Sequence, residues 1–192
     1  GVAQRTGATV YYVELFPKEA AQRAGKDPVL ALMPVPGDVD LVIAAEFVEA
    51  GRAITRGFVT PETTLIASTH RDFAISEKIQ MGDGRQNTDR ILEAARKSSK
   101  KLIIADMADA AAKSGSVISS VLFGAVAGAN VLPISREQFE SQIKQLGRAV
   151  EGNMRGFALG YDLAQSQSAI GAGEPAHNQN AASASTVVAP II

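Results

Sequence analysis

The sequence predicts an α/β fold, with a three-layer α/β/α arrangement around a mostly parallel, mixed sheet and further helices toward the C-terminal end. Short apolar runs alternate with longer segments of helical periodicity, which is the order of elements expected for a sheet covered on both faces. The run 39–45 is almost continuously apolar, as in a strand buried on both sides. The stretch 117–130 is apolar nearly all round and predicts a helix inside the core.

Five short runs are predicted to be strands, because they are apolar and end at proline, glycine or polar residues. They are 9–16, 29–33, 39–45, 63–68 and 101–105. The polar segment 18–26, which contains Gly25, is expected to be a loop. The segment 70–85 is also expected to be irregular and to end in a Gly82-Asp83-Gly84 turn.

Six segments have helical patterns: 46–56, 88–98, 107–113, 117–130, 136–146 and 149–164. Ser135 and Gln138 have the spacing of a capping box, which fixes the start of the fifth. Gly57 is expected to end the first, and either Asp106 or Asp109 to cap the third. The last is predicted to be helical although it carries three glycines, each of which costs about 1 kcal/mol relative to alanine.

These elements predict one domain over residues 1–164. Residues 165–192 are rich in Ala, Ser, Gln and Asn and have no periodicity, so they are interpreted as a mostly disordered tail or a linker.

Composition restricts the possible functions. The formal net charge is -1 with both signs dispersed, which gives no basis for a nucleic-acid or membrane surface. The chain has no cysteine, so it cannot form disulfides, use a thiolate nucleophile or ligate iron–sulfur clusters through cysteine. His70 and His177 are its two histidines and lie far apart, so no metal site is expected. A cytoplasmic location fits this composition.

The opening segment Gly1–Thr9 contains the most distinctive motif. It cannot be a Walker A loop, because five residues separate Gly1 from Gly7 and Ala8 stands where the phosphate-binding lysine would be. A glycine-bearing turn before a strand is the simpler interpretation. The polar residues of this loop are nevertheless expected to be exposed, and its arginine could bind a carboxylate or phosphate of a partner. They are Gln4, Arg5, Thr6 and Gly7.

Other motifs are more simply explained by structure than by catalysis. Ser68 and His70 are separated by one residue but have no nucleophile elbow around them, which favours a polar loop at a strand end. Glu46 and Glu49 fit the first turn of a helix, where the helix dipole favours carboxylates. Gly124 and Gly128 are expected to allow close packing in the core. From these residues alone, no catalytic centre is identified.

Five ordered segments resemble the gamma-type domain of 2-oxoacid oxidoreductases, closest to the beta subunit of the indolepyruvate type. They are GVAQRTGATVYYVELFP (1–17), ALMPVPGDVDLVIAAE (31–46), EAGRAITRGFVTPETTLIASTHR (49–71), EKIQMGDGR (77–85) and SGSVISSVLFGAVAG (114–128). The resemblance extends from Gly1 to about Gly160 and does not include the segment from Gln165.

The resemblance implies a division of labour between subunits. Thiamine diphosphate, its magnesium ion and the iron–sulfur clusters would lie on a large partner subunit, and none of them on this chain. The complex would oxidatively decarboxylate aryl-2-oxoacids, normally to an acyl-CoA, and pass electrons to an acceptor such as ferredoxin. The loop Gln4–Gly7 would contact the partner, the isolated chain would be inactive, and a homodimer is possible. The Gly82-Asp83-Gly84 turn lacks the later Asn pair of a thiamine motif, in agreement with this division.

One departure from the family pattern concerns the segment that would precede Gly1. Family members usually have a strand, a Gly-rich turn and a helix there, and without that strand the sheet is expected to have a gap or an unpaired edge. Two other functions stay open: a module that binds a nucleotide or CoA at its strand ends, and a purely structural scaffold.

Overall fold

The computed structural model describes residues 10–70, 84–170 and 185–189. In chain order the elements are β1 (Tyr11–Leu15), α1 (Lys18–Ala24), β2 (Leu41–Ala44), α2 (Phe47–Thr55), β3 (Thr64–Ser68), α4 (Gly84–Ser98), β4 (Lys101–Ala105), α5 (Met107–Ser114), α6 (Ile118–Ala129), α7 (Arg136–Leu146), α8 (Val150–Ile170) and β5 (Ser185–Ala189).

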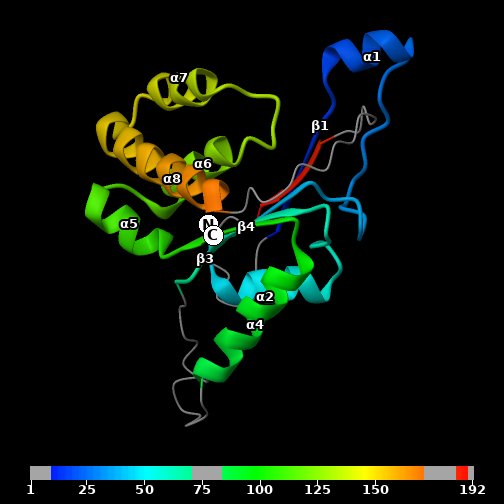
Figure 1. Ribbon diagram of the computed structural model, residues 1–192. Coiled ribbons are helices and arrows are strands. Elements are labelled where there is room, and N and C mark those ends of the chain that lie inside the picture. Colours follow the sequence, from blue (N-terminus) through cyan, green and yellow to red (C-terminus); the bar gives the residue numbers. More distant parts are fainter. Residues whose placement is uncertain (1–9, 71–83, 171–184, 190–192) are drawn as a thin grey trace, which may run out of the picture.

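The described strands form one mixed sheet with the order β1-β5-β2-β3-β4. Strands β5, β2, β3 and β4 run parallel to one another, whereas β1 runs antiparallel to its neighbour β5. Helices α2 and α4 lie on one face of the sheet, and α5 to α8 lie on the other (Figure 1). The predicted three-layer α/β/α class, with helices following the sheet, is confirmed.

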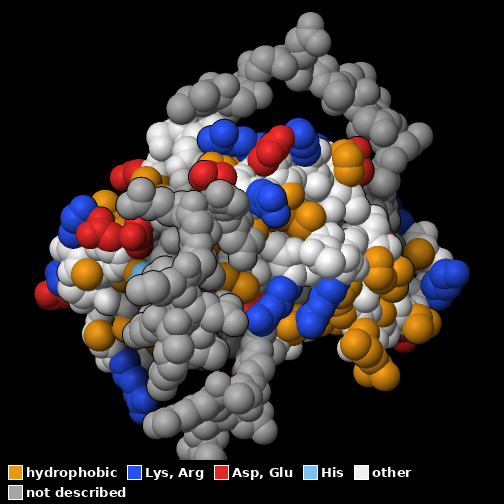
Figure 2. Space-filling model, turned by 90° about the horizontal axis from the view of Figure 1, so that it is seen from below, with side chains coloured by type: hydrophobic (Ala, Val, Ile, Leu, Met, Phe, Trp, Pro, Cys, Tyr) orange, Lys and Arg blue, Asp and Glu red, His pale blue; other side chains and the backbone are white. Residues whose placement is uncertain are grey.

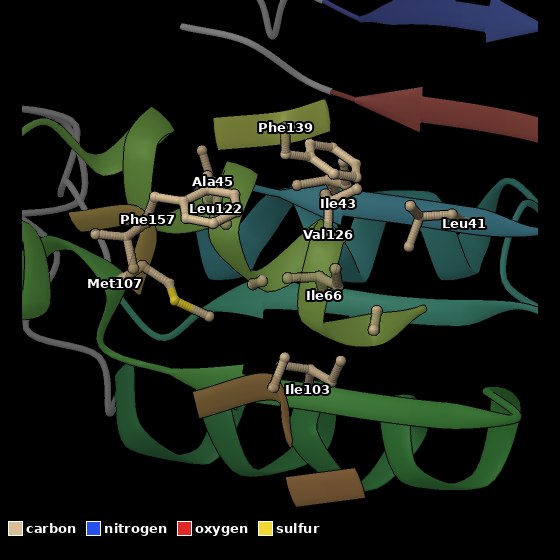
Figure 3. Packing of buried hydrophobic residues seen from close by; sticks show 14 of the residues in the cluster. Leu41, Ile43, Ala45, Ile66, Ile103, Met107, Leu122, Val126, Phe139 and Phe157 are labelled. Carbon is tan, nitrogen blue, oxygen red and sulfur yellow. The ribbon is translucent and has the colours of Figure 1, made fainter. Parts of the chain in front are cut away.

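Alternation along the strands divides the core between the two faces. In β2, Leu41 and Ile43 join the cluster under α5 to α8, whereas Val42 and Ala44 join the cluster under α2 and α4. Figure 3 shows the first cluster, in which Ile66 and Ile103 continue the row set by Ile43 across the sheet. The strands are therefore buried on both faces, as their continuous apolar character predicts.

Glycines allow helices α6 and α8 to touch backbone to backbone. A Cβ added at Gly124 would lie 1.9 Å from the carbonyl oxygen of Phe157, and one at Gly160 would lie 1.8 Å from that of Val121. A Cβ added at Gly128 would lie 2.6 Å from the carbonyl oxygen of Tyr161, whereas one at Gly156 would lie 2.2 Å from the hydroxyl oxygen of Ser116. The predicted packing role of Gly124 and Gly128 is confirmed, and the glycines of α8 serve helix packing despite their cost in helix propensity.

No described helix is by itself long and apolar enough to cross a membrane, and α5 with α6 reaches those limits only as a pair bent by 111°.

Two predictions for residues 18–33 are wrong. Residues 18–24 form α1 and not a loop, because Gly25 adopts φ 65 and ends a helix made of strong helix formers. Residues 29–33 are not a strand, and no described strand pairs with them. Instead the N–H of Ala31 donates to a Glu14 carboxylate oxygen at 2.7 Å. Pro28 and Pro34 flank this run and lack the N–H groups that strand pairing needs, and the chain bends at residues 32 and 33.

Two described parts of the segment 165–192 also differ from the predicted disordered tail or linker, whereas residues 171–184 and 190–192 lie outside the described residues. Helix α8 continues to Ile170, and residues 185–189 form β5 in the middle of the sheet. Val187 pairs with Val13 of β1 on one side and with Leu41 of β2 on the other. Short composition-biased strands have no periodicity of their own, and their pairing with distant residues decides the outcome.

Candidate functional site

The carboxyl ends of β2, β3 and β4 form the surface at which parallel sheets usually bind ligands and partners. The strands end at the same level, since Ala44 is paired with Ala67, and Ser68 with Ala105. The loops that follow present the polar residues of this edge. They are Glu46, Thr69, His70 and Asp106.

Ser68 is the most buried polar residue at this edge and its hydroxyl has a structural role. Its side chain is 0% exposed, and its Oγ accepts hydrogen bonds from the backbone N–H groups of His70 and Met107, each at 3.2 Å. The hydroxyl thus joins the loop after β3 to the first residue of α5. This geometry supports the interpretation of Ser68-Thr69-His70 as a polar strand-end loop, because a nucleophile must be reachable by substrate.

Backbone hydrogen bonds connect the other loops of the edge. The N–H of Phe47, at the start of α2, donates to the carbonyl oxygen of His70 at 3.2 Å. The N–H of Thr69 donates to the carbonyl oxygen of Ala105 at 2.9 Å. Together with the bonds of the Ser68 hydroxyl, these contacts join the three loops into one surface.

Asp106 is the N-cap of α5, the first of the two candidates from the sequence. Its carboxylate accepts from the N–H of Asp109 at 2.9 Å. Asp109 in turn forms an ion pair with Lys113 at 2.5 Å, and this hydrogen bond and charge raise the pKa of Lys113. Both carboxylates are thereby explained by helix stability.

Of the two other carboxylates predicted for a first helical turn, Glu49 has a similar explanation and lies in the first turn of α2. Glu46 occupies the N-cap position of α2 without a side-chain capping bond, and Glu49 accepts a hydrogen bond from Arg52 at 2.6 Å. Among the described residues, no group of three His, Asp or Glu side chains could hold a metal ion.

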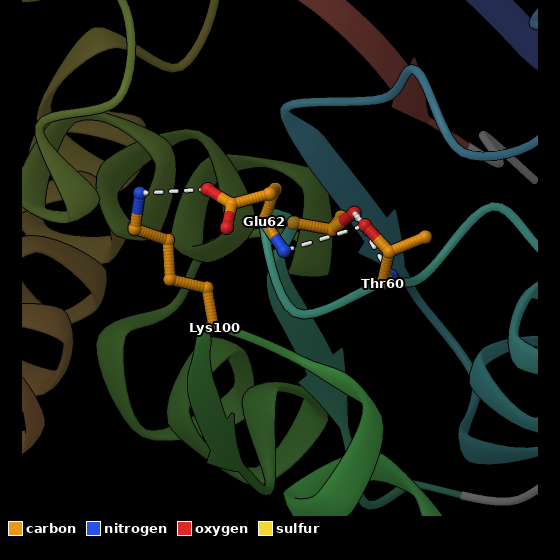
Figure 4. Close-up of polar contacts among 4 residues, drawn as sticks. Thr60, Glu62 and Lys100 are labelled. Atoms are coloured by element: carbon orange, nitrogen blue, oxygen red, sulfur yellow. Dashed lines mark hydrogen bonds and ion pairs between the residues drawn. The ribbon is translucent and has the colours of Figure 1, made fainter. Parts of the chain in front are cut away.

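The opposite edge of the sheet, at the amino ends of β3 and β4, has a network of polar contacts that stabilises the turn before β3. Thr63 is 0% exposed, and its Oγ1 accepts from the N–H of Thr60 at 3.0 Å. Glu62 donates its N–H to Thr60 Oγ1 at 3.3 Å and pairs with Lys100 at 3.5 Å (Figure 4). These contacts align the starts of β3 and β4, and the functional candidates remain at the carboxyl edge.

The residues predicted to contact a partner lie outside the described part of the chain, so their role stays a prediction. They are Gln4, Arg5, Thr6 and Gly7. The same holds for Gly82 and Asp83, whereas Gly84 begins α4. The bonds made by the Ser68 hydroxyl cannot be predicted from the sequence, because Met107 is distant in sequence and no local signal reports such a bond.

The fold and this edge define the class: an α/β/α domain that presents a polar loop surface, in which the Ser68 hydroxyl and the Asp106 carboxylate make structural hydrogen bonds. Residues 1–163 match the family described as pyruvate ferredoxin/flavodoxin oxidoreductase, and the chain belongs to that family. Membership points to a subunit of a 2-oxoacid oxidoreductase. No curated protein and no solved structure matches the chain significantly.

Proposed function

We propose that the chain is the subunit without cofactors of an indolepyruvate-type 2-oxoacid oxidoreductase. It acts with a large subunit that holds thiamine diphosphate, magnesium and iron–sulfur clusters. Together they oxidatively decarboxylate aryl-2-oxoacids in the cytoplasm, with CoA as acyl acceptor and ferredoxin as electron acceptor. The observation that carries this proposal is the family match over residues 1–163.

The chemistry of the chain supports the division of labour. Iron–sulfur clusters are held by cysteine thiolates, and these 192 residues include no cysteine. The chain would therefore supply shape and electrostatics around a cofactor held by the partner. The carboxyl edge of β2, β3 and β4 and the loop Gln4–Gly7 are the surfaces proposed to contact that partner.

Reconstitution tests the proposal. The chain, the large subunit and the two together are assayed for reduction of ferredoxin with indolepyruvate and CoA. We expect turnover only when both are present. Turnover by the chain alone, or retained thiamine or iron on the purified chain, would contradict the proposed division.

The variant Arg5→Ala distinguishes two roles of the chain in the complex: a contact that supports turnover, and a scaffold that supports only assembly. A functional contact predicts lower turnover per assembled complex, whereas a scaffold predicts less complex with unchanged turnover in the complex that forms. Arg56→Ala is the matched control, because Arg56 is an exposed arginine at the C-cap of α2, the end of the helix that lies opposite the carboxyl edge.

A second candidate is a nucleotide- or CoA-binding module. The observation in its favour is that α2 and α5 begin at the carboxyl edge, where helix N-termini attract phosphates. The carboxylates of Glu46 and Asp106 at those same positions act against it, because they place negative charge where a phosphate would bind. Calorimetry with CoA and ATP decides between the two, and the absence of heat would eliminate the module.

A further inference from the structure

An apolar run at residues 29–35, which follows α1, lies mostly in water. Val29 and Leu32 are 97% and 98% exposed. The run is part of an arm, residues 10–35, that projects from the sheet (Figure 1). Figure 2 shows apolar side chains gathered at the right-hand end of the molecule, the end that holds the arm in Figure 1. The properties of such a surface depend on its staying apolar.

Met33 places a sulfur atom within this run. The chain has four methionines and no cysteine, so thioethers are its only sulfur groups and no thiolate competes with them for an oxidant. Met33 is 74% exposed, whereas Met107 is 0% exposed and Met154 packs against the core cluster that contains Met107. Met81 lies outside the described residues. Among the described methionines, Met33 is therefore the one that a dissolved oxidant reaches most easily.

The exposure of Met33 follows from how the run is attached to the arm. The N–H of Ala31 donates to a Glu14 carboxylate oxygen at 2.7 Å, and the hydroxyl of Tyr12 donates to the same oxygen at 3.1 Å. The chain then bends at residues 32 and 33, and Met33 belongs to neither of the core clusters. Its thioether is thus accessible in the folded chain, without any opening of the core.

We propose that Met33 is a reversible oxidation site, at which a peroxide converts the thioether to a sulfoxide. A sulfur lone pair attacks one oxygen of hydrogen peroxide, the O–O bond breaks and an S–O bond forms. The proton of the transferred hydroxyl passes to the departing hydroxide, which leaves as water. The sulfur loses two electrons and the peroxide gains them. A methionine sulfoxide reductase reverses the step, because two of its thiols supply two electrons, form a disulfide and release the oxygen as water.

Oxidation at Met33 changes the surface of the arm and leaves the core intact. A sulfoxide is polar and accepts hydrogen bonds, so its formation beside Leu32 interrupts the apolar run. Covering a sulfoxide with an apolar surface removes it from water without a hydrogen-bond donor, which is unfavourable. The oxidised arm therefore binds apolar surfaces more weakly than the reduced arm. The inference does not depend on the proposed enzymatic function.

The first test measures the oxidation rate of each methionine in the full chain. Folded and denatured chain are treated with hydrogen peroxide, and peptide mapping by mass spectrometry gives the rates. We expect Met33 to react in the folded chain nearly as fast as in the denatured chain. It should also react more than about tenfold faster than Met107, which reacts only when the core opens. Equal rates for Met33 and Met107, in a chain that circular dichroism shows to be folded, would overturn the proposal.

The second test measures whether oxidation makes the arm less apolar, as retention of the full chain on a phenyl matrix. Peroxide-treated wild type should elute earlier than untreated wild type, and a methionine sulfoxide reductase should restore the original retention. The retention of Met33→Leu should not change with peroxide, whereas the control Met154→Leu should respond as wild type does. Three results would each overturn the proposal: no change in wild type, an equal change in Met33→Leu, or a sulfoxide at Met33 that the reductase does not remove.

Discussion

The side-chain amide of Gln167 pairs with the backbone of Ile104 as a neighbouring strand would. Its Oε1 accepts the N–H of Ile104 and its Nε2 donates to the carbonyl oxygen of the same residue, both at 2.8 Å. Strand β4 is the last strand on its side of the described sheet. The end of α8 therefore covers an edge whose polar groups would otherwise need water or another chain.

We expect Gln167→Ala to lower the free energy of unfolding by about 1–3 kcal/mol, because it leaves two part-buried backbone groups of Ile104 without this partner. Urea denaturation measures the change. Gln142→Ala is the control, since Gln142 is exposed on α7 and makes one weak bond to Gln145 at 3.4 Å. Equal stability of Gln167→Ala and wild type would show that the pair contributes nothing.

Gly160→Ala is expected to destabilise the domain by about 3 kcal/mol or more, because α8 must move away from α6 to admit the methyl group. The added Cβ would lie 1.8 Å from the carbonyl oxygen of Val121, a backbone atom that cannot rotate away. Gly51→Ala in α2 is the matched control, because its Cβ would meet the flexible Ile91 side chain at 3.2 Å. Thermal melting of both variants decides, and similar melting temperatures would contradict this packing.

The variant Ser68→Ala tests whether the Ser68 hydroxyl has a structural role or acts as a nucleophile. Two backbone N–H groups lose their acceptor, and we expect a loss of about 1–3 kcal/mol in the free energy of unfolding. Turnover per assembled complex with the large subunit should stay close to wild type. Ser166→Ala is the control, because Ser166 is an exposed serine of α8 that bonds to Leu163. A stable Ser68→Ala chain whose complex is inactive would assign Ser68 to catalysis.

Val187→Pro in β5 is expected to release β1 from the sheet, because proline lacks the N–H and interrupts a strand paired on both sides. Hydrogen exchange measures the effect. Amides of β1 should lose protection, while those of β3 and β4 should keep it, since these strands pair with each other. Unchanged protection of β1 would show that β5 does not hold it.

The pKa values of Lys101 and Lys113 are expected to shift in opposite directions, because the two side chains have different surroundings. Burial lowers the pKa of Lys101, whose Nζ donates to Ala129 at 3.2 Å, whereas the bond and charge of Asp109 raise the pKa of Lys113. NMR titration of the lysine side chains should show Lys101 losing its proton first. Asp109→Asn should lower the pKa of Lys113 and leave that of Lys101 unchanged.

The same shifts predict how pH affects stability. The folded state disfavours protonated Lys101, so its penalty is relieved as pH rises from its folded pKa toward the ordinary value of about 10.4. Stabilisation from Lys113 is present below that ordinary value and is lost as pH rises through its raised pKa. The free energy of unfolding of Asp109→Asn is measured against pH beside that of wild type. If the two curves coincide both below and above about pH 10, Lys113 contributes no such stabilisation.

Local signals predicted the elements whose ends are set by nearby residues. Helix α7 has the predicted bounds, because Ser135 and Gln138 form both bonds of a capping box within one turn. Strand β4 also has its predicted bounds. Local signals failed at residues 29–33, where an apolar run looks like a strand but has no described strand to pair with. They also failed at 18–24, where a glycine that ends a helix was interpreted as part of a loop.

The candidate site was predicted in position but not in detail. The alternation of strands and helices placed Ser68, Thr69 and His70 at the carboxyl edge, because consecutive parallel strands all end there. Which groups are engaged could not be predicted, because the acceptor role of Ser68 depends on Met107, a residue of another loop.

Most helices and strands of this chain could be predicted from the sequence, because helix caps and hydrophobic periodicity act within a few residues. The lack of cysteine likewise shows, without a structure, that the chain has no thiolate ligand for an iron–sulfur cluster. Tertiary structure alone decided that Val187 lies between Val13 and Leu41, that Gln167 covers Ile104, and that the apolar run from Val29 stays in water. Strand pairing and burial depend on which distant segments come into contact, and these contacts exist only in the folded chain.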